Sequence, residues 1–277
     1  MSSFPLNFAI LAARCFQSPS ISGDLSAANF SSSTISTYVS ALSYVHKLGN
    51  FPDPTKNFLL QKLLTAHSKL HSSPDVRLPI TRSVLQHLVL ALNHTNSSAF
   101  QRLLYQTMFL VAFYGFFRVG ELTIKGANLK SLVQVQELHF QFANNVVTSA
   151  TIVIKDFKHN NTRRPFSVFL ERAEGSRLCP VAYLQRYFST RGATPGPLFC
   201  FADGSPVKTS QFTQQLQQAL NFCGLDSTKY KSHSFRIGAD SLEAEKGLSD
   251  AQIRHLGHWK SDAFKLYIRQ PTGVSKD

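Results

Sequence analysis

Four side chains near the C-terminal end of the sequence could act together on one anionic group: His233, Arg236, His258 and Tyr267. His233 and Arg236 belong to the segment HSFR. Residues three apart on a helix share a face, so both could point at one phosphate. A tyrosine hydroxyl can attack phosphorus and form a covalent ester. Because a phenol has a pKa near 10, the attack also needs a proton acceptor and a positive field, which the histidines and arginine would supply.

Two upstream basic residues would complete a site for phosphoryl transfer. Arg118, in FFRVGEL, could join Arg236 in clamping a phosphodiester, because guanidinium stays charged and binds phosphate bidentately. Such a clamp stabilises the charge that develops in the transition state. Lys158, near the tip of a predicted hairpin, could protonate the leaving 5′ oxygen, and Lys155, farther from the turn, is the alternative. The sequence shows none of the clustered carboxylates of two-metal nucleases, so we expect neither a metal nor another cofactor.

This set of residues resembles the signature of the tyrosine recombinases (the phage integrase family). That signature is an arginine before a helix, a hairpin lysine, an HxxR box, a late His or Trp and a nucleophilic tyrosine. The matching residues here are Arg118, Lys158, His233, Arg236, His258 and Tyr267. Glu121 occupies the acidic position of the family in a supporting role, in which it orients Arg118 or caps its helix, and Trp259 is assigned to packing beneath the site. The segments STISTYVSALSYVHKLG, SHSFRIGAD and LGHWKSDAFKLYIR look most like integrases of DIRS- and Crypton-type eukaryotic mobile elements.

The resemblance implies an enzyme that cuts and rejoins DNA at specific sites. Tyr267 would attack one strand, leaving a 3′-phosphotyrosyl bond and a free 5′-OH, and a partner strand would reverse the step without ATP or metal. The implied partner is double-stranded DNA, bound by a tetramer on two sites, with a monomer or weak dimer in its absence. The implied compartment is the nucleus, or another intracellular compartment, and we expect no membrane association or secretion. Two alternatives stay open: a type IB topoisomerase, and a DNA-binding remnant of a mobile element.

The charge of the chain favours a polyanionic partner. It holds 29 Lys and Arg against 16 Asp and Glu, a net charge of +13. Neutralised phosphates release counterions, so such an excess favours nucleic acid. The candidate phosphate contacts are Arg163, Arg164, Lys208, Lys229, Lys231 and Lys260. The cysteines form no CxxC pair, so we expect reduced thiols, and the apolar run MFLVAFYGFF is too short to span a membrane.

Hydrophobic periodicity predicts a mainly α fold with a small antiparallel β-sheet (α+β). Ser33 is predicted to cap a helix that ends at Gly49, and Asp53, followed by Pro54, to cap a second one. Prolines in HSSPDVRLPIT indicate a linker, which divides the chain into residues 1–76 and 77–277. The family implies a helical SAM-like core-binding (DNA-clamp) domain and a catalytic domain, respectively. Residues 1–30 fit the clamp poorly, so its truncation at the N-terminus is an alternative.

The second part of the chain is predicted to contain the sheet. Strands are expected at about 137–142, 149–157 and 164–170, with a polar turn around His159–Thr162. Helices are expected at about 81–94, 97–113, 180–191, 209–223, 233–246, 249–256 and 262–268. In this arrangement Arg118 precedes a helix start and Lys158 lies in the hairpin, so both must fold back onto the C-terminal cluster.

Overall fold

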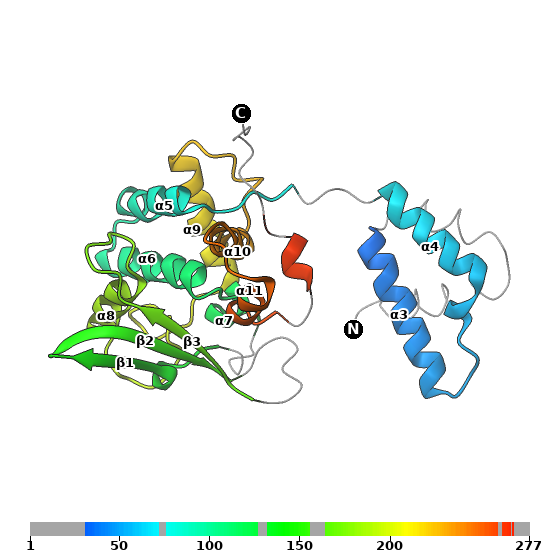
Figure 1. The fold of residues 1–277 in the computed structure, drawn as a ribbon, viewed down its shortest axis with the longest axis horizontal. Coiled ribbons are helices and arrows are strands. Elements are labelled where there is room, and N and C mark those ends of the chain that lie inside the picture. Colours follow the sequence, from blue (N-terminus) through cyan, green and yellow to red (C-terminus); the bar gives the residue numbers. More distant parts are fainter. Residues whose placement is uncertain are drawn as a thin grey trace. The chain divides into compact units, whose positions relative to one another are not determined.

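The computed structural model describes residues 31–71, 76–126, 132–155, 164–259, 262–266 and 268. The chain forms two compact units that divide between Asp75 and Val76. The described residues are mostly helical and contain one three-stranded antiparallel sheet, so the predicted fold class is confirmed (Figure 1). No helix within these residues is both long and apolar enough to cross a lipid bilayer.

The described residues of the first unit form the α-helices α3 (Ser32–Leu48) and α4 (Phe58–His71). The N-cap of α3 is Ser31 and not Ser33, because the Ser31 hydroxyl accepts the N–H of Thr34 at 3.2 Å. The predicted second helix is interrupted: Asp53 caps a 3₁₀ turn, Pro54–Lys56, and α4 begins only at Phe58. The side chain of Asn57 accepts the N–H of Leu59 at 2.9 Å, which starts a new helix there.

The second unit is built around α6 (Ala99–Tyr114), which is buried along most of its length. Three of the longer described helices pack on α6: α5 (Arg82–Thr95), α8 (Pro180–Arg191) and α10 (Ser234–Glu245). A further helix, α9 (Thr209–Phe222), packs on α5. The short helix α7 (Val119–Leu122) packs on α6, and α11 (Asp250–Leu256) packs on α10; both lie below α10 in the view of Figure 1. The predicted last helix is a 3₁₀ helix, Asp262–Leu266.

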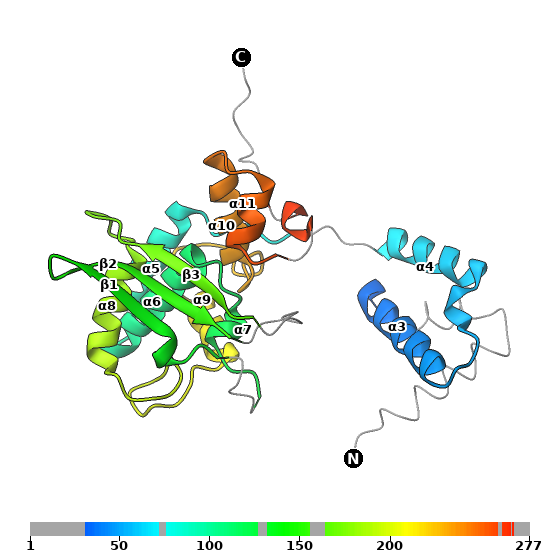
Figure 2. The ribbon, with the colours of Figure 1, turned by 60° about the horizontal axis from the view of Figure 1, so that its bottom comes forward.

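The sheet has the order β1 (Leu138–Ala143), β2 (Val146–Ile154), β3 (Phe166–Glu171). Ala150 pairs with Phe140 on one side and Leu170 on the other. Helix α8 packs on β2 and β3, so one face of the sheet is covered by helices, and Figure 2 shows the strands in front of them.

The segment 137–142, predicted as a strand, corresponds to β1. A turn at Asn144 and Asn145, both with positive φ (51° and 62°), joins it to β2, which therefore starts earlier than predicted. The predicted turn that carries Lys158 lies outside the described residues.

Candidate active site

The end of α6 and the start of α7 place Arg118. Gly115 ends α6, and a Cβ on it would lie 2.5 Å from the ring of Phe117, so only glycine fits without a shift of the chain. Phe116 follows with φ of 53°, a left-handed conformation that turns the backbone sharply. Phe117 is fully buried and anchors the turn. Arg118 then becomes the N-cap of α7, so its backbone position is fixed by the packing on both sides.

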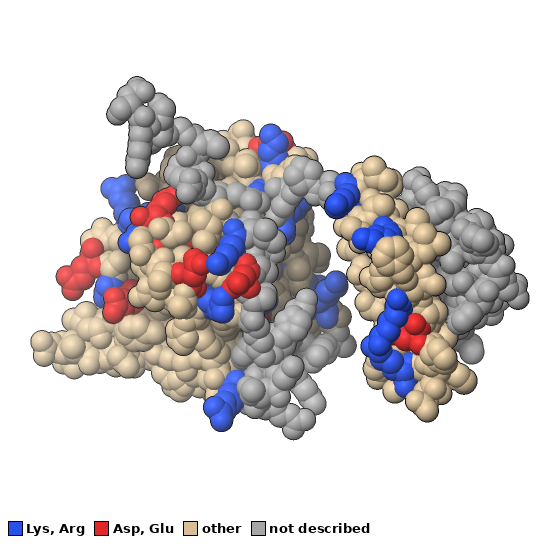
Figure 3. Space-filling view, turned by 45° about the vertical axis from the view of Figure 1, so that its right-hand side comes forward, with Lys and Arg blue, Asp and Glu red and all other residues tan. Residues whose placement is uncertain are grey.

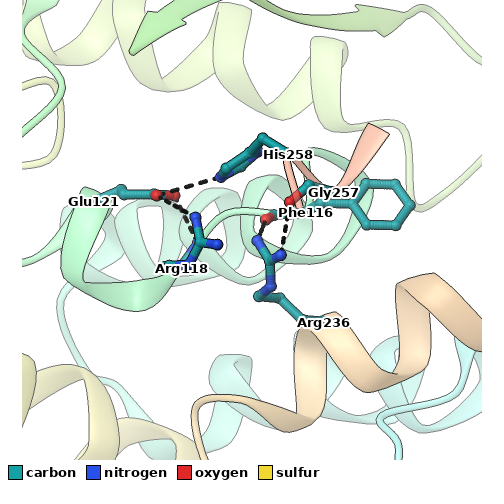
Figure 4. A network of polar contacts seen from close by, with 6 residues as sticks. All are labelled: Phe116, Arg118, Glu121, Arg236, Gly257 and His258. Carbon is teal, nitrogen blue, oxygen red and sulfur yellow. Dashed lines mark hydrogen bonds and ion pairs between the residues drawn. The ribbon is translucent and has the colours of Figure 1, made fainter. Parts of the chain in front are cut away.

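Glu121 is the buried carboxylate of the site. One oxygen accepts the backbone N–H of Arg118 at 2.8 Å, which closes the first turn of α7. The other oxygen accepts from Nη1 of Arg118 at 3.1 Å and lies 3.3 Å from Nε2 of His258 (Figure 4). Glu121 therefore both caps the helix and orients two side chains that come from positions 140 residues apart in the sequence.

Burial and these contacts shift two pKa values. Burial acts to raise the pKa of Glu121, but the hydrogen bond and charge of His258 and the charge of Arg118 outweigh it, so the pKa lies below its usual range. Burial lowers the pKa of His258, and the nearby arginines add to this effect more weakly, whereas Glu121 opposes it. The carboxylate is thus ionised at neutral pH and the imidazole is mainly neutral.

Arg236 lies on α10 and is only 1% exposed. Its guanidinium donates to the backbone carbonyl oxygen of Phe116, and through Nη2 to that of Gly257 at 2.7 Å (Figure 4). The indole of Trp259 lies over it, with 4.2 Å between Cζ and the ring centroid, and lies 5.8 Å from Cζ of Arg118. The predicted role of Trp259 is packing beneath the site, and in the structure it contacts the cation of Arg236 directly.

The two histidines of the predicted cluster have different neighbours. His233 precedes the first residue of α10, and its ring meets the Trp259 indole edge to face at 6.3 Å. His258 has positive φ (41°), and the ring of Phe166 from β3 lies 4.9 Å from its imidazole. The sheet therefore reaches this cluster through Phe166, a contact that the sequence did not indicate.

Several predicted residues cannot be placed in this cluster. Tyr267, Lys158, Arg163 and Lys260 lie outside the described residues. Lys155 is exposed, and its ammonium lies 3.2 Å from the Glu137 carboxylate. Four other predicted phosphate contacts are exposed: Arg164, Lys208, Lys229 and Lys231.

One buried carboxyl group was missed by sequence reasoning. Asp240 is 0% exposed and accepts the indole N–H of Trp259 at 3.3 Å. Its position four residues after Arg236, which places both on one helix face, was the available signal. Within the described parts of the chain, no group of three His, Cys, Asp or Glu residues is arranged to hold a metal ion.

Neither a protein-family model nor a curated protein matches the chain, but solved structures do. XerH site-specific recombinase bound to its difH substrate is 15% identical, with a TM-score of 0.53 over 87% of this chain and 68% of that chain. The Tn1549 transposon integrase in complex with transposon right end DNA is 11% identical, with a TM-score of 0.58 over 96% and 81%. A lambda integrase dimer bound to a COC′ core site is 14% identical, with a TM-score of 0.51 over 98% and 89%. The chain therefore has the fold shared by these recombinases and integrases.

Proposed function

We propose that the chain cuts and rejoins DNA strands at specific sites, with Tyr267 as the nucleophile and a 3′-phosphotyrosyl intermediate. The observation that carries the proposal is the convergence of Arg118, Arg236 and His258 around one carboxylate and one indole. These residues come from three separate elements, and fixed cations of this kind are what a phosphoryl transfer site requires. The fold shared with recombinases and integrases supports the same reaction class.

The proposed roles follow from the surroundings of each group. Arg118, 23% exposed at its side chain, contacts the phosphate first. Arg236 donates to the carbonyl oxygens of Phe116 and Gly257, and we propose that phosphate oxygens replace one of these acceptors when DNA binds. The lowered pKa of His258 leaves an imidazole that can accept the proton of the Tyr267 hydroxyl. His233 contributes a further hydrogen bond, and Lys158 protonates the leaving 5′ oxygen.

Charge supports double-stranded DNA as the partner. The whole chain carries +13, and residues 31–71 hold four lysines against one aspartate. Figure 3 shows blue side chains on the face of this unit that is turned to the viewer, with red confined to one place. We propose that a tetramer acts on two DNA sites in the nucleus. The three segments that look like DIRS- and Crypton-type integrases make a mobile-element integrase the favoured assignment.

The experiment traps the covalent intermediate on DNA of random sequence, so it does not depend on a chosen target site. The protein is incubated in EDTA with a pool of nicked random duplexes. Covalent adducts are captured after denaturation in detergent, and their DNA is sequenced. We expect adducts that retain the 5′ end label of the cut strand, a released strand with a free 5′-OH, and a nucleotide remnant on Tyr267 by mass spectrometry. Sequenced adducts should share a motif.

Matched variants separate the alternatives. Tyr267→Phe should abolish the adducts, whereas Tyr183→Phe, on α8 and apart from the cluster, should keep them. Relaxation of supercoiled plasmid without a shared motif would favour the type IB topoisomerase. Salt-sensitive DNA binding with no adduct on any sequence would contradict strand cleavage and favour the DNA-binding remnant.

The same assay distinguishes the two lysines. If Lys158 is the general acid, Lys158→Ala should slow cleavage on the order of 100-fold. Lys155 is paired with Glu137 on the surface, so Lys155→Ala should slow it far less. The opposite ranking would transfer the role to Lys155.

A further inference from the structure

Asp240 is a buried carboxyl group that the proposed chemistry does not use. It lies on α10 four residues after Arg236, is 0% exposed, and follows the apolar sequence Ile237–Ala239. Burying a carboxylate is costly unless partners compensate for the lost hydration. Its Oδ2 atom has no hydrogen-bond partner among the described residues. A buried carboxyl oxygen without a hydrogen-bond partner is uncommon in folded proteins and calls for an explanation.

The other oxygen of Asp240 holds the indole that covers Arg236. Oδ1 accepts the N–H of Trp259 at 3.3 Å, and the same indole lies 4.2 Å from Cζ of Arg236. Asp240 and Arg236 project from one face of α10, so the indole is held at its N–H edge and contacts the cation with its ring. The three side chains therefore determine one another's orientation.

Gly257 provides independent evidence that this arrangement is tight. A Cβ on Gly257 would lie 2.3 Å from Nε1 of Trp259 and 3.4 Å from Oδ1 of Asp240. The carbonyl oxygen of Gly257 also accepts from Arg236 at 2.7 Å. The backbone of the loop thus packs directly against the edge of the indole that bonds to Asp240, and no side chain fits there without moving the indole.

We propose that Asp240 is a positioning residue, whose carboxyl fixes the indole of Trp259 against Arg236 and thereby fixes the orientation of that arginine. Its importance for a reaction rests on the proposed function, in which Arg236 binds the phosphate. The contact between carboxyl and indole does not depend on that function, so the two can be tested separately.

The ionisation of Asp240 offers a way to observe the contact. Burial raises the pKa of its carboxyl to about 7, and the charges of Arg236 and Arg118 and the Trp259 hydrogen bond oppose this rise. The carboxyl therefore gains or loses its charge near neutral pH, beside the indole. The other titratable groups of the cluster are His233, His258 and Glu121.

The test uses the intrinsic fluorescence of Trp259, which is the single tryptophan of the chain. With excitation at 295 nm, the emission of the full-length protein is recorded against pH. We expect a transition with a midpoint near pH 7 that disappears in Asp240→Asn, which keeps a hydrogen-bond acceptor but cannot ionise. Asp240→Leu removes the acceptor, and we expect acrylamide quenching of the indole to rise at least twofold. Asp226→Asn, an exposed carboxyl, is the control and should leave both signals unchanged.

The proposal would be overturned if acrylamide quenched the indole of Asp240→Leu no more than that of the wild type, provided that circular dichroism shows the variant to be folded. Should that variant not fold, the proposal fails if the transition persists in Asp240→Asn or is absent from the wild type. A transition that persists in Asp240→Asn and is lost in His233→Gln would assign the signal to the histidine.

The functional consequence is measured on a duplex found by covalent trapping. Asp240→Leu should lower the cleavage rate constant about tenfold at unchanged Kd for the duplex, and Asp240→Asn should restore it at pH 6. An unchanged rate constant would contradict the link between the indole and Arg236. If the wild type cuts no DNA, the proposed function fails, while the fluorescence result still decides the role of Asp240.

Discussion

The two arginines of the site differ in their exposure to solvent and in the charge of the groups that they contact. The side chain of Arg118 is 23% exposed and pairs with the carboxylate of Glu121. Arg236 is 1% exposed and meets two neutral carbonyl oxygens and an indole. The charge of Arg118 is thus balanced by a fixed anion, whereas the carboxyl nearest to Arg236 along its helix, Asp240, can be neutral or charged.

This difference gives the two regions opposite responses to pH. A raised folded-state pKa, as for Asp240, means that the folded protein holds the proton more tightly, so this group's contribution to stability falls as pH rises toward 7. A lowered folded-state pKa, as for His258, means that the unfolded chain binds the proton more readily, so stability falls as pH drops below 6.5. The region around Arg118 is therefore weakened by acid and the region around Arg236 by base.

The largest expected effect is the difference in stability between the alanine variants of the two arginines. Arg236→Ala should lower the free energy of unfolding by about 4 kcal/mol, because it leaves two buried carbonyls without their donor and opens a cavity. Arg118→Ala should cost only about 1 kcal/mol, because its ion pair is partly exposed. Urea unfolding monitored by Trp259 emission measures both, and equal costs would remove the distinction between the two environments.

Glu121→Ala should produce the next largest loss, about 3 kcal/mol, since it removes the cap of α7 and the buried anion that two donors share. The His258 ring should also titrate at lower pH, which NMR detects, because Glu121 favours its protonated form. Glu121→Gln keeps one acceptor and should lose less. If Glu121→Ala left the pKa of His258 unchanged, the 3.3 Å contact between these two side chains would contribute little to that pKa.

Asp240→Asn should change the pH dependence of stability. With a pKa of about 7 when folded and 3.8 when unfolded, the carboxyl should remove about 2 kcal/mol of wild-type stability between pH 5 and pH 7. The free energy of unfolding of the asparagine variant lacks this pH dependence. The wild type should therefore become progressively less stable relative to the variant as pH rises from 5 to 7. A difference that stays constant over this range would mean that the folded and unfolded states release this proton together, so that the pKa of Asp240 is not raised.

The sequence predicted the elements of this fold well because their signals are local. Thr81 caps α5, and Ser249 caps α11, as their hydroxyls and the apolar spacing that follows indicate. Boundaries shifted where two local signals competed. Asp53 and Pro54 favour a helix start, but they nucleate only a 3₁₀ turn because Asn57 supplies a second cap.

The surroundings of the site residues could not be read in the same way. Burial of Asp240 depends on α10 packing against α6, and the contact of Phe166 with His258 depends on where β3 ends, both of which are long-range outcomes. The sequence did place Glu121 beside Arg118 and Trp259 beneath the site, but it did not indicate that Arg236 would be buried against two backbone carbonyl oxygens and the indole. The residue types that could act on a phosphate were visible in the sequence, whereas their burial and their contacts depend on how distant elements pack.

The smallest expected effect concerns His258, and it completes the comparison. In an Asp240→Asn background, which removes the opposing slope, the protein should lose stability as pH falls below 6.5, by at most about 1.4 kcal/mol per pH unit for one proton. Adding His258→Gln should abolish this loss, because the amide can still face Glu121 but does not titrate. Urea unfolding at pH 5, 6 and 7 measures the difference. A difference between the two variants that is the same at all three pH values would show that His258 keeps its ordinary pKa despite burial, and the opposition between the two regions would then rest on Asp240 alone.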